Sequence, residues 1–274
     1  MHPNLYALPM YLTRHVLLQY IFRKPFGIHS PFLYDFACRC LYARDRLPDF
    51  DLIENLRHTL LQDQTILDIT DFGRGTGRHK RREGDAPLLY KRKISSIARH
   101  SLQSPAMCRL LYRTVQYFSP DHILELGTSL GISTAYLAKA APKARIITLE
   151  GCEQTADRAR SLFRKTKLHN IEVITGDFKQ TLGEALQKLQ KVGLVYLDGD
   201  HSYSGVMNNF CKIIEHLDEN SVLILDDIRW SKGMKKAWLE IAGHHKTTLA
   251  VDLFSLGIVF FNPSLSKQII PVGY

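Results

Sequence analysis

The second half of the chain alternates between short apolar runs and longer amphipathic segments. The apolar runs carry few polar positions on either face, as do strands of a parallel sheet covered by helices; they span 122–127, 145–150, 171–177, 193–200 and 221–228. Each is followed by a segment with the apolar period of a helix, at 129–141, 155–166, 180–190, 204–217 and 233–243. This alternation predicts an open, doubly wound α/β domain.

Two more apolar runs follow, at 247–254 and 257–262. Only Ser255 and Leu256 separate them, which is too short for a crossover and predicts an antiparallel hairpin. We therefore expect a mostly parallel, seven-stranded sheet with an antiparallel C-terminal hairpin. In open sheets of this kind, ligands bind beyond the C-terminal ends of the strands.

The first part of the chain has a different pattern, mainly that of helices. Apolar residues recur with helical spacing over 50–62 and 104–118, and 65–72 reads as a short strand between them. These patterns predict two units: a mainly helical N-terminal extension at 1–103 and a ligand-binding domain at 104–274.

The apolar segment at residues 5–22 raises the question of targeting. Arg14 and His15 interrupt it, and it lacks a basic start. We expect a packed or surface-lying helix rather than a signal peptide or a membrane span. The five cysteines are odd in number and form no C-x-x-C pair, which indicates a reducing, cytoplasmic location.

The positive charge is concentrated near the N-terminus. Residues 1–119 carry 18 Lys and Arg against 10 Asp and Glu, and eight of these basic residues fall between Arg74 and Lys93. The glycine-rich stretch 71–93 therefore predicts a basic loop. It could be a mobile lid that contacts an anionic acceptor, a solvated insertion, or a contact for nucleic acid.

Two glycine-rich segments compete for the role of nucleotide loop, DFGRGTG at 71–77 and ELGTSLGIST at 125–134. A nucleotide loop leaves a buried strand, turns tightly and enters a helix whose amides face the ligand. The second segment meets this test, whereas the first runs into the polar sequence RHKRREGDAP. We therefore place the nucleotide at 125–134.

Acidic residues end the strands that follow the chosen loop. Glu150 lies 23 residues after Gly127, where its carboxylate could accept hydrogen bonds from both ribose hydroxyls. Asp177 ends the next strand, on the side expected for the adenine.

Together, ELGTSLGIST, ITLE, TGDF, LVYLDGDHSY and LILDDI resemble the class I S-adenosylmethionine-dependent methyltransferases. The closest resemblance is to bacterial O-methyltransferases related to catechol O-methyltransferase, over roughly residues 104–262. It implies a Rossmann-like methyltransferase fold and S-adenosylmethionine as cofactor. The cofactor-binding residues that it implies are Glu125, Gly127, Thr128, Ser129, Gly131, Ser133, Glu150, Asp177, Phe178 and Asp198.

Three acids end neighbouring parallel strands, and carboxylates suit Mg²⁺. Asp198 follows the fourth strand, and Asp226 and Asp227 follow the fifth. The resemblance also implies a metal at these positions, although the same acids could instead cap helices and bind the cofactor amine. His201 lies three residues after Asp198 and is the candidate base, with Asp198 as a second catalytic residue.

The residues around His201 complete the predicted site. We expect Asp200 to orient His201, and Tyr203 and Trp230 to wall the acceptor pocket. The best-supported function is O-methylation of a small-molecule hydroxyl, with a homodimer as one assembly left open. The alternatives are a nucleic-acid methyltransferase, a non-catalytic cofactor-binding module and a nicotinamide dehydrogenase; the G-x-x-x-G spacing argues against the last.

Overall fold

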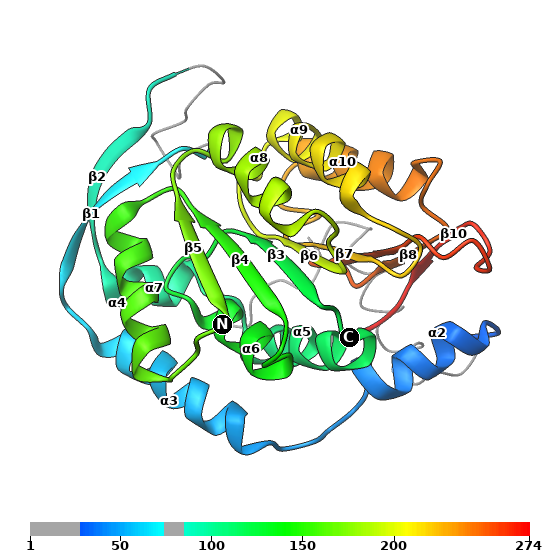
Figure 1. The fold of residues 1–274 in the computed structure, drawn as a ribbon, viewed down its shortest axis with the longest axis horizontal. Coiled ribbons are helices and arrows are strands. Elements are labelled where there is room, and N and C mark those ends of the chain that lie inside the picture. The colour runs from blue at the N-terminus through cyan, green and yellow to red at the C-terminus, as the bar shows by residue number, and fades with distance from the viewer. Residues whose placement is uncertain (1–27, 74–84) are drawn as a thin grey trace, which may run out of the picture.

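The computed structural model describes residues 28–73 and 85–274. Its centre is an eight-stranded sheet in the order β10-β8-β9-β7-β6-β3-β4-β5, with helices on both faces (Figure 1). Its strands are β3 (His122–Leu126), β4 (Arg145–Glu150), β5 (Ile171–Thr175), β6 (Leu194–Leu197), β7 (Val222–Leu225), β8 (Leu249–Asp252), β9 (Gly257–Phe260) and β10 (Gln268–Pro271).

The strand pairing agrees with the prediction of a doubly wound sheet. Strands β3 to β7 run parallel, and β9 lies antiparallel between β7 and β8, which confirms the C-terminal hairpin. The predicted count of seven strands is wrong by one, because β10 pairs in parallel with β8. The strand order reverses between the neighbouring strands β3 and β6, and the helices that follow these two strands pack on opposite faces of the sheet. Such a reversal opens a crevice at the C-terminal ends of the two strands.

Each face of the sheet has its own core. On one face, α8 (Phe178–Leu189), α9 (Tyr203–Ile213) and α10 (Lys232–Gly243) pack over it. The other face carries α5 (Pro105–Phe118), α6 (Ile132–Ala140) and α7 (Glu153–Lys165). The predicted cap of α5 is confirmed, since Ser104 accepts a hydrogen bond from the Met107 amide with Pro105 at the first helical position.

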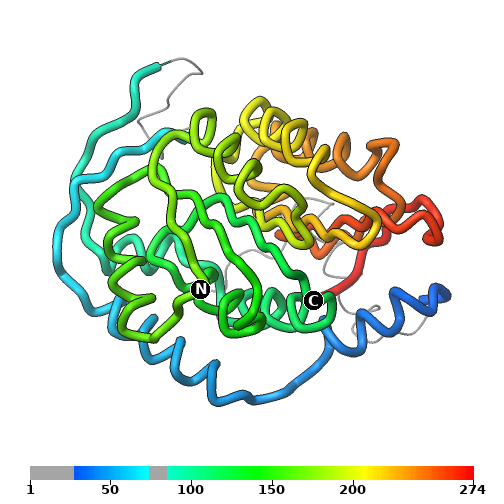
Figure 2. Tube along the Cα trace, in the orientation of Figure 1, coloured from blue at the N-terminus to red at the C-terminus, as the bar shows by residue number. Residues whose placement is uncertain are grey.

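The N-terminal elements extend this second layer. They are α2 (Pro31–Phe36), the π-helical turn η1 (Ala37–Leu41) and α3 (Pro48–Gln62). Residues of α2 and η1 share a buried cluster with α5 and the sheet. The Tyr42 hydroxyl donates to the Gly273 carbonyl at 3.0 Å, so this segment lies against the C-terminus (Figure 2). The predicted domain boundary at 103–104 stays a prediction.

A separate hairpin stands at the edge of the molecule, on the left in Figure 1. It consists of β1 (Ile66–Asp71) and β2 (Leu88–Lys93), paired antiparallel, and α4 (Ile94–Ser101) follows it. The predicted strand at 65–72 is thus confirmed. The prediction of a loop throughout 71–93 is wrong for 88–93, because these residues form a strand that is hydrogen-bonded to β1. Residues 74–84 lie outside the described part of the chain.

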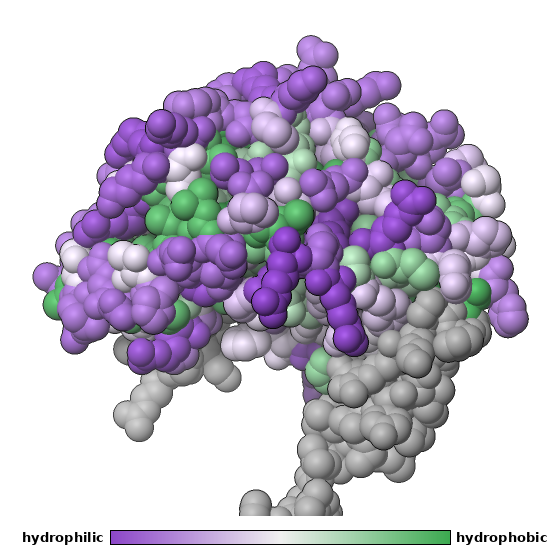
Figure 3. Space-filling model, turned by 90° about the horizontal axis from the view of Figure 1, so that it is seen from below, coloured by the Kyte–Doolittle hydropathy of each residue, from purple (hydrophilic) through white to green (hydrophobic). Residues whose placement is uncertain are grey.

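No helix within the described residues is long and apolar enough to cross a membrane. Figure 3 shows a face that is mostly hydrophilic, with a limited apolar area. The exposed large apolar side chains of the described residues are scattered over several elements: Tyr34, Leu52, Ile66, Leu89, Trp230, Leu239 and Ile269. The predicted helix at 5–22 lies outside the described residues.

Candidate cofactor and acceptor site

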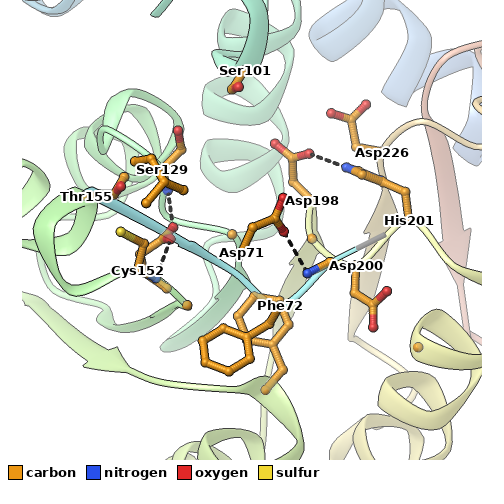
Figure 4. Close-up of a pocket in the computed structure, with 18 of the residues that line it drawn as sticks. Asp71, Phe72, Ser101, Ser129, Cys152, Thr155, Asp198, Asp200, His201 and Asp226 are labelled. Carbon is orange, nitrogen blue, oxygen red and sulfur yellow. Dashed lines mark hydrogen bonds and ion pairs between the residues drawn. The ribbon is translucent and has the colours of Figure 1, made fainter. Parts of the chain in front are cut away.

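A cavity of about 490 Å³ lies beyond the C-terminal ends of the central strands. Ser129 and Cys152 lie on one side of it, and Asp198, His201 and Asp226 lie on the other (Figure 4). Asp71 and Phe72, from the end of β1, are drawn between them. The cavity is therefore where the sheet topology predicts it, but its wall includes a segment far away in sequence.

The glycine loop between β3 and α6 approaches the neighbouring chain closely. Gly127 has a φ of 105°, and a Cβ there would lie 2.2 Å from the carbonyl oxygen of Asp198. Gly131 has a φ of 85° and would meet the ring of Phe163 at 2.8 Å. Both positions therefore require glycine. The strand–loop–helix context predicted for this loop is confirmed, since α6 begins at Ile132.

Glu150 lies at the end of β4, and backbone amides hold its carboxylate. One oxygen accepts a hydrogen bond from the Ser129 amide at 2.8 Å, and the other accepts from the Cys152 amide at 3.0 Å. Burial raises the pKa of Glu150, and these amide bonds partly oppose that rise. A carboxylate has about four acceptor positions, so Glu150 keeps acceptor capacity for a ligand in the cavity.

Not all of the predicted cofactor residues face the cavity. Six of them line it: Gly127, Ser129, Glu150, Asp177, Phe178 and Asp198. The other four support the loop from behind: Glu125, Thr128, Gly131 and Ser133. Glu125 is fully buried and accepts hydrogen bonds from the hydroxyls of Ser133 and Thr148 at 2.6 and 2.7 Å. Asp177 both lines the cavity and caps α8 by accepting from the Lys179 amide.

Beyond β6 and β7, two acids share a tyrosine hydroxyl. The Tyr196 hydroxyl lies 3.2 Å from Asp198 and 3.1 Å from Asp226, and the Gln103 amide donates to both Tyr196 and Asp226. Burial, followed by the neighbouring acids, raises the pKa of Asp198 well above its usual range. Burial and Asp227 raise the pKa of Asp226 in the same direction.

Sequence analysis missed Tyr196 and Gln103. A signal for Tyr196 was present, because it lies two residues before Asp198 on the same side of the strand. The sequence offered no comparable signal for Gln103. This residue directly precedes Ser104, the N-cap of α5, and it reaches the acids only because α5 packs on the sheet with its N-terminus at the strand ends.

The acids do not form a metal site in this arrangement. Both oxygens of Asp226 already accept hydrogen bonds, one from Tyr196 and Gln103 and the other from the Asp227 amide. Among the described residues, no group of three or more His, Cys, Asp or Glu side chains has a geometry that could hold a metal ion. The donor set therefore does not fit the predicted Mg²⁺ as it stands.

His201 faces the acids across the cavity. Its Nε2 atom lies 4.0 Å from Asp198 and 3.9 Å from Asp227, and the first of these pairs is drawn in Figure 4. The imidazole ring lies 6.3 Å from that of Trp230, centre to centre. Trp230 is 66% exposed and is the one large exposed apolar residue of the described chain that lines the cavity.

Two residues near His201 are placed differently from the prediction. No described contact joins Asp200 to His201; the Asp200 carboxylate instead lies over Gly205, where a Cβ would come within 1.9 Å of it. Tyr203 does not line the cavity, because its hydroxyl donates to Glu240 at 2.7 Å and Lys236 lies over its ring. The expectation that Tyr203 walls the pocket is therefore wrong.

Comparison with known proteins gives matches over the residues that form this site. Residues 124–228 match the family model described as a methyltransferase domain. An O-methyltransferase from Aspergillus hancockii is 29% identical over 50% of this chain and 56% of its own length. The chain spans between 19% and 56% of the length of the first three curated relatives that it matches.

Solved structures share the fold at lower identity. The S-adenosylhomocysteine-bound methyltransferase of Podospora anserina has a TM-score of 0.56 and 14% identity, covering 85% of this chain and 96% of that one. The O-methyltransferase of Bacillus cereus in complex with S-adenosylhomocysteine has a TM-score of 0.53 and 18% identity, covering 84% and 97%. Residues 124–228 are therefore similar to a methyltransferase domain, the curated relatives include O-methyltransferases, and the solved structures share the methyltransferase fold.

Proposed function

We propose that this protein transfers a methyl group from S-adenosylmethionine to a hydroxyl of a small molecule. The observation that carries the proposal is the Glu150 carboxylate, fixed by the Ser129 and Cys152 amides at the wall of the cavity. Its remaining acceptor capacity suits the hydroxyls of a ribose. The matched methyltransferase domain supports the same function.

The cavity wall fits the cofactor along its length. Glu150 and Asp177 would hold the nucleoside, and Gly127 and Ser129 would let the backbone approach the methionine part. When bound, S-adenosylmethionine supplies an electrophilic methyl group. Asp198 ends β6 beside Gly127, so the reacting groups would meet between the glycine loop and the acids.

His201 is the candidate base. His201 Nε2 would accept the hydroxyl proton as the acceptor oxygen takes the methyl group that the cofactor supplies. Asp198 and Asp227, at 4.0 and 3.9 Å, would stabilise the imidazolium that forms. The exposed ring of Trp230 would bound the acceptor next to His201.

The charges around His201 disfavour an anionic acceptor. Asp198, Asp200, Asp226 and Asp227 line this end of the cavity, and such a surface would repel a carboxylate or phosphate. The alternative of a nucleic-acid acceptor depended on the eight basic residues between Arg74 and Lys93, of which Lys91, Arg92 and Lys93 lie in β2 and the other five lie outside the described part of the chain. The acids around His201 argue against an anionic acceptor at this end of the cavity.

The sequence-based prediction of Mg²⁺ is not used in this proposal. Gln103 and Tyr196 occupy the Asp226 oxygen that a metal would need, so no step is derived through a metal. Whether the reaction requires Mg²⁺ is decided by measuring turnover with and without a chelator.

Calorimetric titration of the full chain with S-adenosylhomocysteine tests the function. Glu150→Ala removes the carboxylate that would accept from the ribose, and a hydrogen bond to a charged group is worth about 1.5–3 kcal/mol, so affinity should fall at least tenfold. Glu153→Ala is the matched control, because this acid lies on α7 and pairs with Arg160 away from the cavity. Equal affinity of the Glu150→Ala and wild-type proteins would overturn the cofactor assignment.

The acceptor is found with a panel of small hydroxyl compounds. The panel should contain neutral, anionic and cationic members, and methyl transfer is followed by release of S-adenosylhomocysteine. We expect the anionic compounds to be the poorest substrates. Turnover only with oligonucleotides would replace this proposal with the nucleic-acid alternative.

A further inference from the structure

The end of β1 is held firmly at the cavity wall. The two oxygens of Asp71 accept hydrogen bonds from the Gly73 amide at 2.8 Å and from the Tyr90 hydroxyl at 3.3 Å. These contacts fix the chain on both sides of Phe72 and tie it to β2. Phe72 is half-buried, lines the cavity and is drawn between Cys152 and Asp200 in Figure 4.

Phe72 packs against a residue without a side chain, Gly151, which directly follows Glu150. A Cβ at Gly151 would lie 3.0, 3.7 and 3.9 Å from three carbons of the Phe72 ring. Gly151 is not among the described glycines with positive φ, so its backbone does not demand glycine. The ring thus occupies the space where a side chain at 151 would extend.

A second phenyl ring stands at the same end of the cavity. Phe178 lies against Gly199, where a Cβ would come within 2.6 Å of the ring. Both rings line the cavity together with Glu150, Gly176 and Asp177. Flat apolar surfaces beside a carboxylate that can bind ribose are suited to a nucleobase, whose faces are flat and apolar and whose edges are polar.

We propose that Phe72 covers the nucleoside half of the bound cofactor, in place of the side chain that Gly151 lacks. This inference rests on the proposed function. It assigns a cofactor contact to the β1–β2 hairpin, which lies outside the matched domain at 124–228. The methyltransferase domain alone would then have an incomplete cofactor pocket.

Binding to two ligands tests the position of Phe72. Calorimetry on the full chain compares S-adenosylhomocysteine with 5′-methylthioadenosine, which keeps the nucleoside and lacks the amino-acid part. Phe72→Ala should weaken both ligands by the same factor, about tenfold, as for loss of one base–aromatic contact. Phe72→Leu should weaken them less, because it keeps an apolar surface. Leu89→Ala is the control on the same hairpin, since Leu89 is 76% exposed.

A double-mutant cycle tests the pairing with Gly151. Gly151→Leu alone should weaken binding, because its side chain collides with the ring of Phe72. In the Phe72→Ala background the same Leu should restore most of the lost affinity, since the space is then free. The effect of Gly151→Leu on the binding free energy should thus have opposite signs in the two backgrounds. Such a reversal measures direct coupling between residues 72 and 151, which general destabilisation does not produce.

The outcomes separate this inference from the proposed function. If the wild-type chain binds S-adenosylhomocysteine and Phe72→Ala binds it equally well, Phe72 is not a cofactor residue. If Phe72→Ala weakens S-adenosylhomocysteine but not 5′-methylthioadenosine, the ring lies over the other half of the ligand and the inference is wrong. If the wild-type chain binds neither ligand, the proposed function fails and this inference fails with it.

Discussion

The backbone amide of Ser129 donates a hydrogen bond to the Glu150 carboxylate at 2.8 Å, joining the loop after β3 to the end of β4. Ser129 has a φ of 48°, in the left-handed region that few residues other than glycine adopt. The strained backbone is thus held in place by a charged acceptor. Ligand-binding geometry at this strand end therefore depends on both residues together.

Gly127→Ala should damage the protein and its cofactor site together. The added methyl would lie 2.2 Å from the Asp198 carbonyl oxygen, and the backbone has a φ of 105°. We expect a loss of stability of about 2–4 kcal/mol, measured by urea unfolding, and loss of S-adenosylhomocysteine binding. Gly183→Ala is the control: nothing lies within 4 Å of its Cβ position on α8, so it should stabilise by about 0.5–1 kcal/mol.

His201→Ala should slow turnover without weakening the cofactor. Removing a general base typically lowers kcat by about 10²–10⁴-fold, whereas Glu150 and the glycine loop remain intact. Steady-state kinetics and calorimetry on the same preparation give both quantities. His58→Ala, on the exposed face of α3, is the control. An unchanged kcat would remove His201 from the reaction.

Asp198→Asn should raise stability, and more so at higher pH. Burial raises the folded-state pKa of Asp198 above its usual 3.8, so the folded protein binds more protons than the unfolded chain. The free energy of unfolding therefore declines as pH rises from 3.8 through the folded-state pKa of Asp198. Above that pKa, the buried carboxylate is ionised and destabilises the protein in full. We expect a gain in Tm of about 2–4 °C near neutral pH.

The pH series separates this electrostatic effect from a general change in packing. The difference in Tm between Asp198→Asn and the wild-type protein should shrink toward low pH, because both are then uncharged at position 198. Asp121→Asn, at an exposed position, is the control. A gain of the same size at all pH values would contradict the raised pKa. Turnover should fall in the same variant, since Asp198 lies beside His201.

Gln103→Leu should destabilise the protein, because two buried side chains lose the hydrogen bond that the Gln103 amide donates to them. Gln103 donates to Tyr196 and to Asp226, both of which are buried. Tyr196 still donates to Asp226 in this variant, so the loss is that of two hydrogen bonds, each worth about 0.5–1.5 kcal/mol and measurable together by urea unfolding. Gln187→Leu, on the exposed side of α8, should cost far less. Equal stabilities of the two variants would show that the Gln103 contacts contribute little.

Millimolar Mg²⁺ should leave the Tm of the free wild-type chain unchanged, because Gln103 and Tyr196 already occupy Asp226. Differential scanning calorimetry with Mg²⁺ and with a chelator measures this directly. A rise in Tm with Mg²⁺ that becomes larger in Gln103→Ala would show that the acids bind the ion once the amide is removed. That result would restore the metal predicted from the sequence.

Much of the fold could be predicted because its signals are local. The parallel strands, the hairpin β8–β9 and the Ser104 cap each follow from the periodicity or chemistry of a few adjacent residues. Strand β2 and α4 escaped prediction because LLYKRK reads as part of a basic loop until β1 pairs with it. Strand β10 lies at the sheet edge, where its alternation of apolar and polar residues is weak.

The sequence by itself determined the glycine loop, the acidic strand ends and their meeting at one edge of the sheet. Parallel strands bring their C-terminal ends to the same edge whatever the details of packing. Only the tertiary structure decided which side chains reach the cavity. Glu125 turned inward to three hydroxyls, Tyr203 turned to Glu240, and Gln103 and Phe72 entered from distant segments. Such contacts depend on side-chain direction and on the docking of whole elements, and short-range sequence patterns encode neither.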